Sequence, residues 1–415
     1  MLVSRRQFLK SSMLVAPTLA FMPTVFKHAV AAATSESFGV RQTNAPGTLV
    51  VVQMAGGNDG LNTLVPYADN RYYDLRGTLA LPQGSVLPLD NEVGLHPSMA
   101  KLKDLWDEGN LAIVEGVGYP NPSFSHFESM DIWQSADLDG NFKEGWLGRY
   151  FEGLQATQSE PFQGMAVGRE LPLALRSSKV PVPTVQSVAR YQLAGDPRFP
   201  DATQDRAQAV LNLFAASPPG APYSVLLDNT MDAAYRSSVA LQNAHAAYQP
   251  GAVYPETPLA EALKLLAEAI TNDLGVKVGH VSIGGFDTHA AQPDDHAALL
   301  TETSEAMAAF YEDLKAHGRD GDVVIMTWSE FGRRVTSNAS DGTDHGTAGP
   351  MFFLGTPIKG GLYGGRPGLS ELGDGNLRFT TDFRSVYATV FEQILGVPSE
   401  AMLGTRYEPL PLLGL

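Results

Sequence analysis

Short apolar runs that end at glycine or polar residues recur along the chain. Thr48 to Met54 is the first, and it is rich in β-branched residues. Runs of this length bounded by turns are typical of buried strands. The same pattern predicts strands over residues 110–116, 276–283, 323–327 and 351–354. Apolar residues at helical spacing predict helices over residues 95–105, 259–274 and 382–395, and another from about Phe124.

The strand over residues 323–327 stops abruptly at a polar loop. Glu330 follows it, and Asp344 and His345 lie just before the next apolar run. Rigid folds present metal ligands and acid–base groups from loops at strand ends. These three side chains are therefore candidates for a metal or acid–base site. The alternative is that they are loop residues satisfied by backbone amides.

Two other strand ends carry similar chemistry. Asp59 lies in the glycine-rich turn after Met54, where it is a candidate metal ligand or the acceptor of an Asx-turn. Asp287 and His289 follow the strand over residues 276–283, and their spacing lets both point into one cleft. His296 begins the next helix, as a further ligand or an ordinary helix-start residue.

A proline-bounded loop after the strand over residues 110–116 leads into a helix. Ser123 is placed to cap that helix, and Ser125 and His126 follow it. A hydroxyl at a helix N-terminus beside a histidine can act as a nucleophile, because the helix dipole stabilises its alkoxide. For Ser123 capping is the favoured role, while Ser125 and His126 stay open between packing and chemistry.

The N-terminal residues predict export. Ser4 to Lys10 contains Arg5 and Arg6, and an apolar stretch and small residues around Ala31 follow. This order resembles a twin-arginine signal peptide over residues 1–33, read by the twin-arginine export machinery. We expect a periplasmic or secreted protein without a stable membrane span after cleavage, because the apolar stretch is short and interrupted by prolines.

Composition narrows the chemistry. The chain has 415 residues with 44% hydrophobic content, enough for a large core in one α/β domain with insertions or in two domains. It has no cysteine, which excludes disulfides, thiolate metal sites and cysteine nucleophiles. Any metal must bind oxygen or imidazole ligands, which suits zinc, manganese, magnesium or calcium. The net charge of −16 argues against nucleic-acid binding, and the glycine spacing predicts no nucleotide cofactor.

Four segments together resemble a known bacterial family. They read AGGNDGLNT, NPSFSHFESMDIW, GGFDTHAAQ and WSEFGRRVTSNASDGTDHGTAGPMFFLG, and they look like the family described as domain of unknown function 1501. The resemblance runs from about Leu49 to the C-terminus. It implies one domain over residues 47–415, with an insertion or cap at about 144–258. The implied fold is similar to the alkaline phosphatase and sulfatase superfamily, a three-layer α/β/α domain with a mixed, mostly parallel central sheet.

The resemblance also implies roles for residues along the chain. The wider superfamily uses an Asp after its first strand, a nucleophile at a helix start, an Asp with a His, an Asp-His pair and a final His. In chain order these positions fall on Asp59, Ser125 or else Ser123, Asp287 with His289 or His296, Glu330, and His345.

Phe331 departs from this pattern, because the superfamily has its second histidine ligand there. An apolar ring cannot coordinate a metal, so at least one of two metals is expected to be lost or differently ligated. The resemblance therefore does not imply two-metal phosphomonoesterase activity. Arg333 or Arg334, one turn after the strand end, is a candidate oxyanion clamp.

These observations predict a metal-dependent hydrolase acting on a phosphate or sulfate ester, small-molecule or polymeric. Its candidate catalytic residues are Ser125, His126 and Arg333, and its candidate metal ligands are Asp59, Asp287, His289, Glu330, Asp344 and His345. The alternative is a non-catalytic binding or assembly protein on the same fold, with its second metal site degenerate at Phe331.

Overall fold

The computed structural model describes residues 45–414, apart from 142, 155–161, 193–204, 206–207, 210–211 and 213–223. The predicted export signal over residues 1–33 lies outside the described residues. Within them, no helix combines the length and apolar character needed to cross a membrane.

A central sheet with strand order β11-β5-β10-β9-β1-β8-β6-β7 organises the described chain, and β12 pairs with β5. Strand β1 lies parallel to β8 on one side and to β9 on the other. Strand β10 is antiparallel to both of its neighbours, β5 and β9. The predicted mixed, mostly parallel sheet is therefore confirmed. The strands are β1 (Thr48–Met54), β5 (Leu111–Gly118), β6 (Gly164–Val167), β7 (Thr184–Val185), β8 (Val278–Ile283), β9 (Val323–Trp328), β10 (Gly349–Leu354), β11 (Gly361–Gly364) and β12 (Thr381–Asp382).

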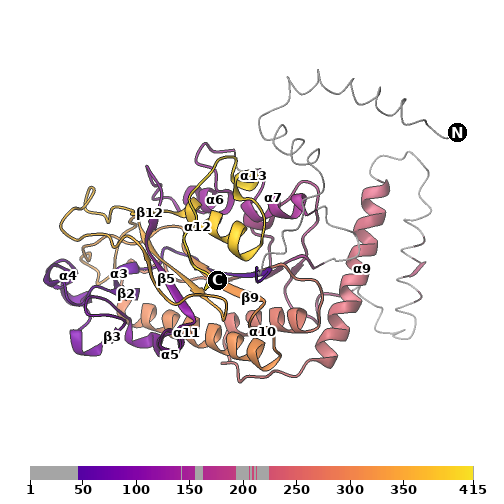
Figure 1. The fold of residues 1–415 in the computed structure, drawn as a ribbon, viewed down its shortest axis with the longest axis horizontal. Coiled ribbons are helices and arrows are strands. Elements are labelled where there is room, and N and C mark those ends of the chain that lie inside the picture. Colours follow the sequence, from indigo (N-terminus) through magenta and orange to yellow (C-terminus); the bar gives the residue numbers. More distant parts are fainter. Residues whose placement is uncertain are drawn as a thin grey trace, which may run out of the picture.

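Helices cover both faces of this sheet, which gives the predicted three layers (Figure 1). One face packs against α5 (Ala100–Asp107), α10 (Pro258–Thr271) and α11 (Gln292–Ala316). The other packs against α6 (His126–Ser135), α7 (Trp146–Gly153), α12 (Phe383–Thr389) and α13 (Ser399–Leu403). The remaining helices are α3 (Gly60–Thr63), α4 (Asn70–Arg76) and α9 (Ser224–Ala247), and a small antiparallel sheet joins β2 (Leu64–Val65), β3 (Leu87–Pro88) and β4 (Gly94–Leu95).

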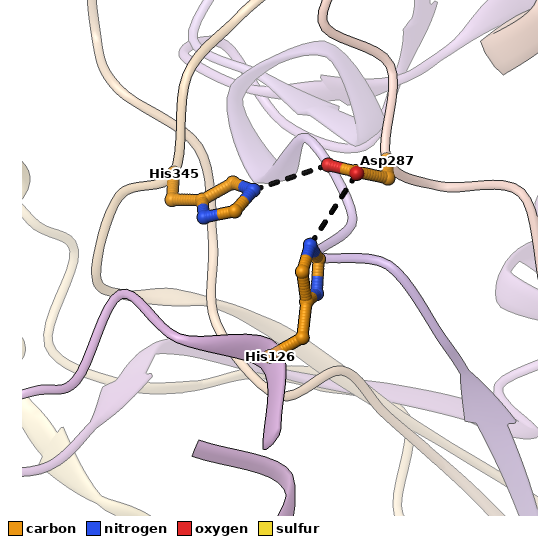
Figure 2. A group of neighbouring side chains, drawn as sticks. All are labelled: His126, Asp287 and His345. Atoms are coloured by element: carbon orange, nitrogen blue, oxygen red, sulfur yellow. Dashed lines mark hydrogen bonds and ion pairs between the residues drawn. The ribbon is translucent and has the colours of Figure 1, made fainter. Parts of the chain in front are cut away.

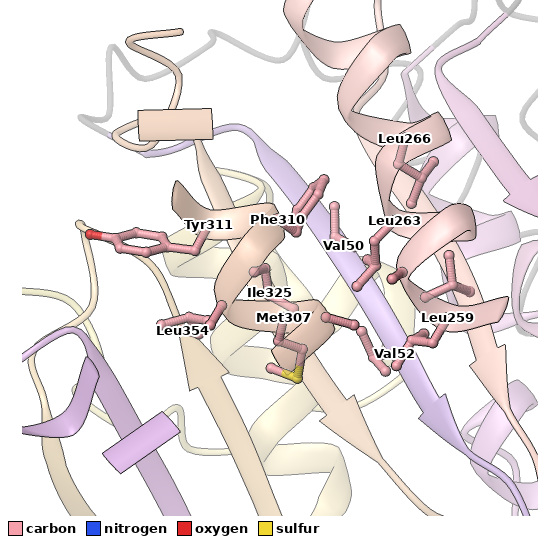
Figure 3. Close-up of a cluster of buried hydrophobic side chains, with 14 of the residues drawn as sticks. Val50, Val52, Leu259, Leu263, Leu266, Met307, Phe310, Tyr311, Ile325 and Leu354 are labelled. Atoms are coloured by element: carbon pink, nitrogen blue, oxygen red, sulfur yellow. The ribbon is translucent and has the colours of Figure 1, made fainter. Parts of the chain in front are cut away.

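Successive side chains of β1 point to opposite faces of the sheet, and helices cover both faces. Val50 and Val52 face α10 and α11, where they meet Leu263 and Phe310 (Figure 3). Leu49 and Val51 face the opposite helical layer. A strand buried on both faces has no polar side to show, so its sequence lacks the apolar–polar alternation of a half-exposed strand.

The sequence boundaries hold to within a few residues. The predicted helix over residues 382–395 is α12 followed by a π-helical turn at Val390–Ile394. From the segment predicted as an insertion or cap, β6 and β7 pair at the β8 side of the main sheet. These two strands belong to the main sheet.

Candidate metal centre

Three strand ends deliver the candidate site. His126 begins α6 after β5, Asp287 follows β8, and Glu330 follows β9. These strands run in the same direction, so their carboxyl ends meet at one edge of the sheet. The approach is close, since a Cβ on Gly56 would lie 2.5 Å from the Asp287 backbone nitrogen. Glycine at this position lets the loops after β1 and β8 touch.

Asp287 is the centre of a cluster of imidazoles. Its Oδ1 lies 3.1 Å from His345 Nε2 and 3.0 Å from His289 Nε2. Its Oδ2 lies 3.4 Å from His126 Nε2 (Figure 2). The donor atoms of His126, Asp287 and His345 all lie within 4.8 Å of one another, and no other such group occurs among the described residues.

Each imidazole of this cluster has a hydrogen-bond acceptor at its outer nitrogen. His345 Nδ1 donates to the Phe124 carbonyl at 2.7 Å. Nδ1 of His289 lies 3.2 Å from Asp344 Oδ1, and Nδ1 of His126 lies 2.9 Å from Glu330 Oε1. With Nδ1 protonated, a neutral imidazole presents the lone pair of Nε2. All three lone pairs then point toward Asp287.

This arrangement fits a cation. The Nε2 atoms of His289 and His345 lie 2.9 Å apart, and two lone pairs at that distance need a proton or a metal ion between them. His126 Nε2 is buried without a hydrogen-bond partner among the described residues. Metal-binding histidines characteristically donate their second ring N–H to a carboxylate or a carbonyl, as these three do.

Arg333 stabilises the negative charge of Asp287. Arg333 Nη2 donates to Asp287 Oδ1 at 2.8 Å. Partial burial raises the pKa of the Asp287 carboxyl, but the hydrogen bond from Arg333 and its positive charge outweigh this effect and lower the pKa to about 2. The side chain is therefore an anion at neutral pH, as a metal ligand must be.

Arg333 itself is buried and its donors are engaged. Its Nε donates to the Gly57 carbonyl at 2.6 Å and its Nη1 to the Thr343 carbonyl at 2.9 Å. Its Nη2 contacts the Gly56 and Phe286 carbonyls in addition to Asp287. The structure thus gives Arg333 a positioning contact to Asp287: its guanidinium is buried, and each of its three nitrogens donates to a backbone carbonyl.

Glu330 and Phe331 form the wall behind the imidazoles. Glu330 is buried and accepts from the Gly56 N–H at 2.9 Å as well as facing His126. The buried Phe331 ring lies 4.9 Å from the His126 ring and 4.6 Å from the His345 ring between centroids. Glu330 therefore orients a histidine, and Phe331 limits how far two of the rings can turn.

Asp59 lies apart from this cluster, in a sealed polar network. Both its oxygens accept from Arg76 at 2.6 Å, and Gln292 Nε2 donates at 2.5 Å. Burial raises the pKa of the Asp59 carboxyl, but the charge of Arg76 outweighs it and the pKa is lowered. Nearby, His296 Nε2 bonds Asn58 Oδ1 at 3.0 Å. The oxygens of Asp59 thus have protein donors already.

Ser125 is the N-cap residue of α6, so the helix begins two residues later than expected. Ser123 Oγ accepts from the Ser125 N–H at 3.2 Å and donates to Glu128 at 2.7 Å. Ser125 is exposed, and its hydroxyl makes no hydrogen bond within the described part of the chain. Its assignment as nucleophile stays a prediction.

Sequence reasoning missed two features of this centre. The sequence pattern predicts a catalytic role for His126 and no ligand role, although its place after β5 puts it on the same sheet edge as Asp287. That shared edge was the available signal. Arg76 and Gln292, which occupy Asp59, carry no motif that points to them.

The family comparison agrees with the predicted resemblance. A family model described as protein of unknown function (DUF1501) matches residues 90–406. No curated protein matches the chain.

Several solved structures resemble the chain weakly. The PsFucS1 sulfatase from Pseudoalteromonas sp. shares 11% identity over 94% of this chain and 75% of its own, with a TM-score of 0.37. The lipoteichoic acid synthase LtaP from Listeria monocytogenes shares 9% over 86% and 72%, with 0.34. A 2-O GAG sulfatase shares 10% over 87% and 75%, also with 0.34. At these scores the likenesses carry no argument about activity.

Proposed function

This chain belongs to the DUF1501 family, and we propose that it is a metal-dependent hydrolase of phosphate or sulfate esters. One observation carries the proposal: three imidazole Nε2 atoms converge on one carboxylate, each with its Nδ1 hydrogen-bonded behind it. Such a set is costly without a cation, because the lone pairs of three imidazoles meet at a carboxylate and face no donor of their own. Hydrolysis of an anionic ester is the reaction that a cation at this edge of the sheet best serves.

The proposed ligands are His126, Asp287, His289 and His345. Three imidazoles and one carboxylate, with no thiolate, favour zinc or manganese over magnesium and calcium, which prefer oxygen ligands. A bound divalent cation would supply Lewis acidity toward a phosphoryl or sulfuryl oxygen. Glu330, Asp344 and the Phe124 carbonyl hold the ring orientations, and Arg333 holds Asp287.

Ser125 is the proposed nucleophile. Its hydroxyl is exposed at the N-terminus of the ten-residue helix α6, next to His126. The helix dipole and a nearby cation both favour the alkoxide over the neutral hydroxyl. In an alternative mechanism, water attacks the ester and Ser125 only contacts the substrate. The substitution Ser125→Ala distinguishes the two mechanisms, because it abolishes turnover completely only if Ser125 is the nucleophile.

A non-catalytic binding or assembly protein is the second candidate. Two observations favour it: no base hydrogen-bonds to Ser125 within the described residues, and the donors of Arg333 are engaged. In that case the centre would hold a metal without turnover. In either case we propose that the protein acts in the periplasm or outside the cell, by the twin-arginine route.

Metal content is the first test. We expect purified full-length protein to carry zinc or manganese by elemental analysis, and the variant Asp287→Ala/His345→Ala to lose it. The matched control is Asp104→Ala/Asp107→Ala, since both residues are exposed and form only surface ion pairs. A wild type without metal after reconstitution, or equal metal in both variants, contradicts the proposal.

Turnover is the second test. Metal-reconstituted protein is assayed on phosphomonoesters, phosphodiesters and sulfate esters, before and after removal of metal by a chelator. We expect activity that the chelator abolishes and added metal restores. A metal-loaded protein that is inactive on every ester, and unaffected by Ser125→Ala, supports the binding protein instead.

A further inference from the structure

We infer that Gln292 is a positioning residue of the proposed metal centre, because its side-chain amide joins the two loops that carry three of the four proposed ligands. The inference rests on the proposed function, and it identifies a side chain that acts on the cation only through the ligands. Three sets of observations support it: the hydrogen bonds of Gln292, the place of its partners in the chain, and the backbone contacts between the two loops.

Gln292 is fully buried, and its carboxamide has three hydrogen-bond partners. Its Oε1 accepts from Thr343 Oγ1 at 2.6 Å and from Thr288 Oγ1 at 3.1 Å. Its Nε2 donates to Asp59 Oδ2 at 2.5 Å. Only one orientation of the amide fits these partners, because a carboxylate accepts and cannot donate, whereas a hydroxyl can donate. The side chain is therefore fixed through both its oxygen and its nitrogen.

The two hydroxyl partners belong to the loops that carry the ligands. Thr288 stands between Asp287 and His289, and Thr343 stands two residues before His345. Both threonines are buried. The amide oxygen that binds both hydroxyls thus fixes the separation of the loop after β8 and the loop before β10. The Nε2 atoms of His289 and His345 face each other across that separation, at 2.9 Å.

Backbone contacts bring the same two loops together. The Thr343 N–H donates to the Thr288 carbonyl at 3.1 Å. A Cβ on Gly342 would lie 2.2 Å from the carbonyl carbon of His289, so the loops touch where there is no room for a side chain. The first N–H of α11 donates to the Asp341 carbonyl at 2.9 Å, and the helix therefore begins against the same loop.

The nitrogen of the amide is anchored on the buried ion pair of Asp59 and Arg76. Arg76 binds both oxygens of Asp59, and both side chains are fully buried. His296, one turn further along α11, bonds Asn58 Oδ1 at 3.0 Å. The start of α11 thus contacts the loop after β1 at two neighbouring residues. Gln292 is therefore held by side chains that are themselves buried and hydrogen-bonded.

His126 reaches the centre separately, from the start of α6, and Glu330 orients its ring. Loss of the amide should loosen the His289–His345 pair and leave the contact between His126 and Glu330 in place. A cation should then still bind, less tightly and with an altered coordination geometry. A residue that only stabilises the fold would change neither property.

The test compares variants that remove hydrogen-bonding atoms with variants that keep them. Gln292→Met and Thr343→Val remove these atoms at similar side-chain volume, and Thr343→Ser keeps the hydroxyl. Gln83→Met, at an exposed site, is the control. In competition titration with a zinc indicator, the Kd should rise about tenfold or more for the first two variants, as when a supporting contact of a metal ligand is lost. Thr343→Ser and Gln83→Met should stay near the wild-type Kd.

The double variant Gln292→Met/Thr343→Val tests whether the two side chains act through one hydrogen bond. It should bind zinc no more weakly than Gln292→Met alone, because the first substitution already removes the contact that the second would break. Additive losses of affinity would show that the two residues act independently, which overturns the inference.

A spectroscopic readout separates positioning from a purely structural role. Cobalt(II) can replace zinc at such sites, and unlike d¹⁰ zinc it absorbs visible light in a way that depends on its coordination geometry. We expect Gln292→Met and Thr343→Val to shift the visible spectrum of the cobalt-loaded protein, and Thr343→Ser to keep the wild-type spectrum. Urea denaturation of the metal-free proteins measures stability separately.

Lower stability of Gln292→Met with an unchanged cobalt spectrum and zinc Kd would show that Gln292 is only structural. That result overturns the inference and leaves the proposed function standing. If Gln292→Met does not fold, the pair Thr343→Val and Thr343→Ser decides, since equal spectra and equal Kd values for these two overturn the inference in the same way. A wild type that binds neither zinc nor cobalt overturns the proposed function and this inference with it.

Discussion

Two aspartates follow glycine-rich turns at the same edge of the sheet, and they have opposite surroundings. Asp59 is fully buried, and Arg76 and Gln292 bind its oxygens. The Asp287 side chain is 47% exposed, and it contacts one arginine and three imidazoles. Both have lowered pKa values and both are paired with an arginine. A carboxylate at a strand end is therefore no sufficient sign of a metal site; what matters is whether its partners are donors or further acceptors.

The difference assigns separate tasks to the two networks. The Asp59 network joins α3, α4 and α11 through satisfied hydrogen bonds, and its loss should unfold the protein. The Asp287 cluster leaves lone pairs unsatisfied, and its loss should remove a ligand. The comparison would be wrong if a substitution at Asp59 removed only a ligand, or if one at Asp287 unfolded the protein.

The largest effect is expected for Asp59→Asn. It leaves Arg76 buried without a counter-ion, which costs about 3–5 kcal/mol of unfolding free energy. Urea denaturation of metal-free protein measures it, with Asp107→Asn, a surface ion-pair residue, as the control within about 0.5 kcal/mol. Asp287→Asn should cost much less, because its side chain is half exposed. Equal losses at Asp59 and Asp287 would show that burial does not separate the two networks.

Glu330→Gln should weaken metal binding with little change in fold. An amide that turns its NH₂ toward His126 cannot accept from Nδ1, so the favoured tautomer is lost. Removing such a supporting acceptor typically lowers metal affinity about 10–100-fold. A competition titration with a zinc indicator measures the Kd, and Glu305→Gln, exposed on α11, serves as control. An unchanged Kd would mean that the carboxylate of Glu330 does not support metal binding.

The buried network should also be acid-sensitive through His296. Burial lowers its pKa from 6.5 to about 4, so between these values the unfolded chain binds a proton that the folded chain does not. Stability therefore falls as pH decreases from about 6.5 to 4, by up to ~1.4 kcal/mol per pH unit from this residue. His296→Gln keeps a donor for Asn58 but does not titrate.

The measurement is the slope of unfolding free energy against pH between 7 and 5, in chelator. We expect a shallower slope for His296→Gln than for the wild type. Glu305→Gln, exposed on the same helix, should keep the wild-type slope. Parallel slopes for all three proteins would rule out His296 as a source of acid sensitivity.

The smallest effect is expected at the rim of the Asp287 cluster. Phe127 follows His126 and is 87% exposed, so Phe127→Ala removes almost no buried surface. Its unfolding free energy should stay within about 0.5 kcal/mol of the wild type. A loss above 1 kcal/mol in the same urea titration would reveal packing at this rim, and the cluster would then be less open than Asp287 suggests.

Much of the fold was predictable from local pattern. Thr48–Met54 and Val323–Trp328 are apolar because both of their faces are buried, and that pattern alone marks them as strands. The antiparallel direction of β10 has no such local signature, since an apolar run reads the same in either direction. Its pairing with β5 and β9 depends on contacts far apart in the sequence.

By itself, the sequence determined which residue types stand at the strand ends, and so that Asp287, His289, Glu330 and His345 could share one edge. Only the tertiary structure decided their tasks. In the folded chain Asp59 pairs with Arg76, Arg333 donates to backbone carbonyls, and His126 lies against Asp287. The physical reason is that a side chain's role depends on the donors and acceptors around it, and those come from segments that meet only when the chain folds.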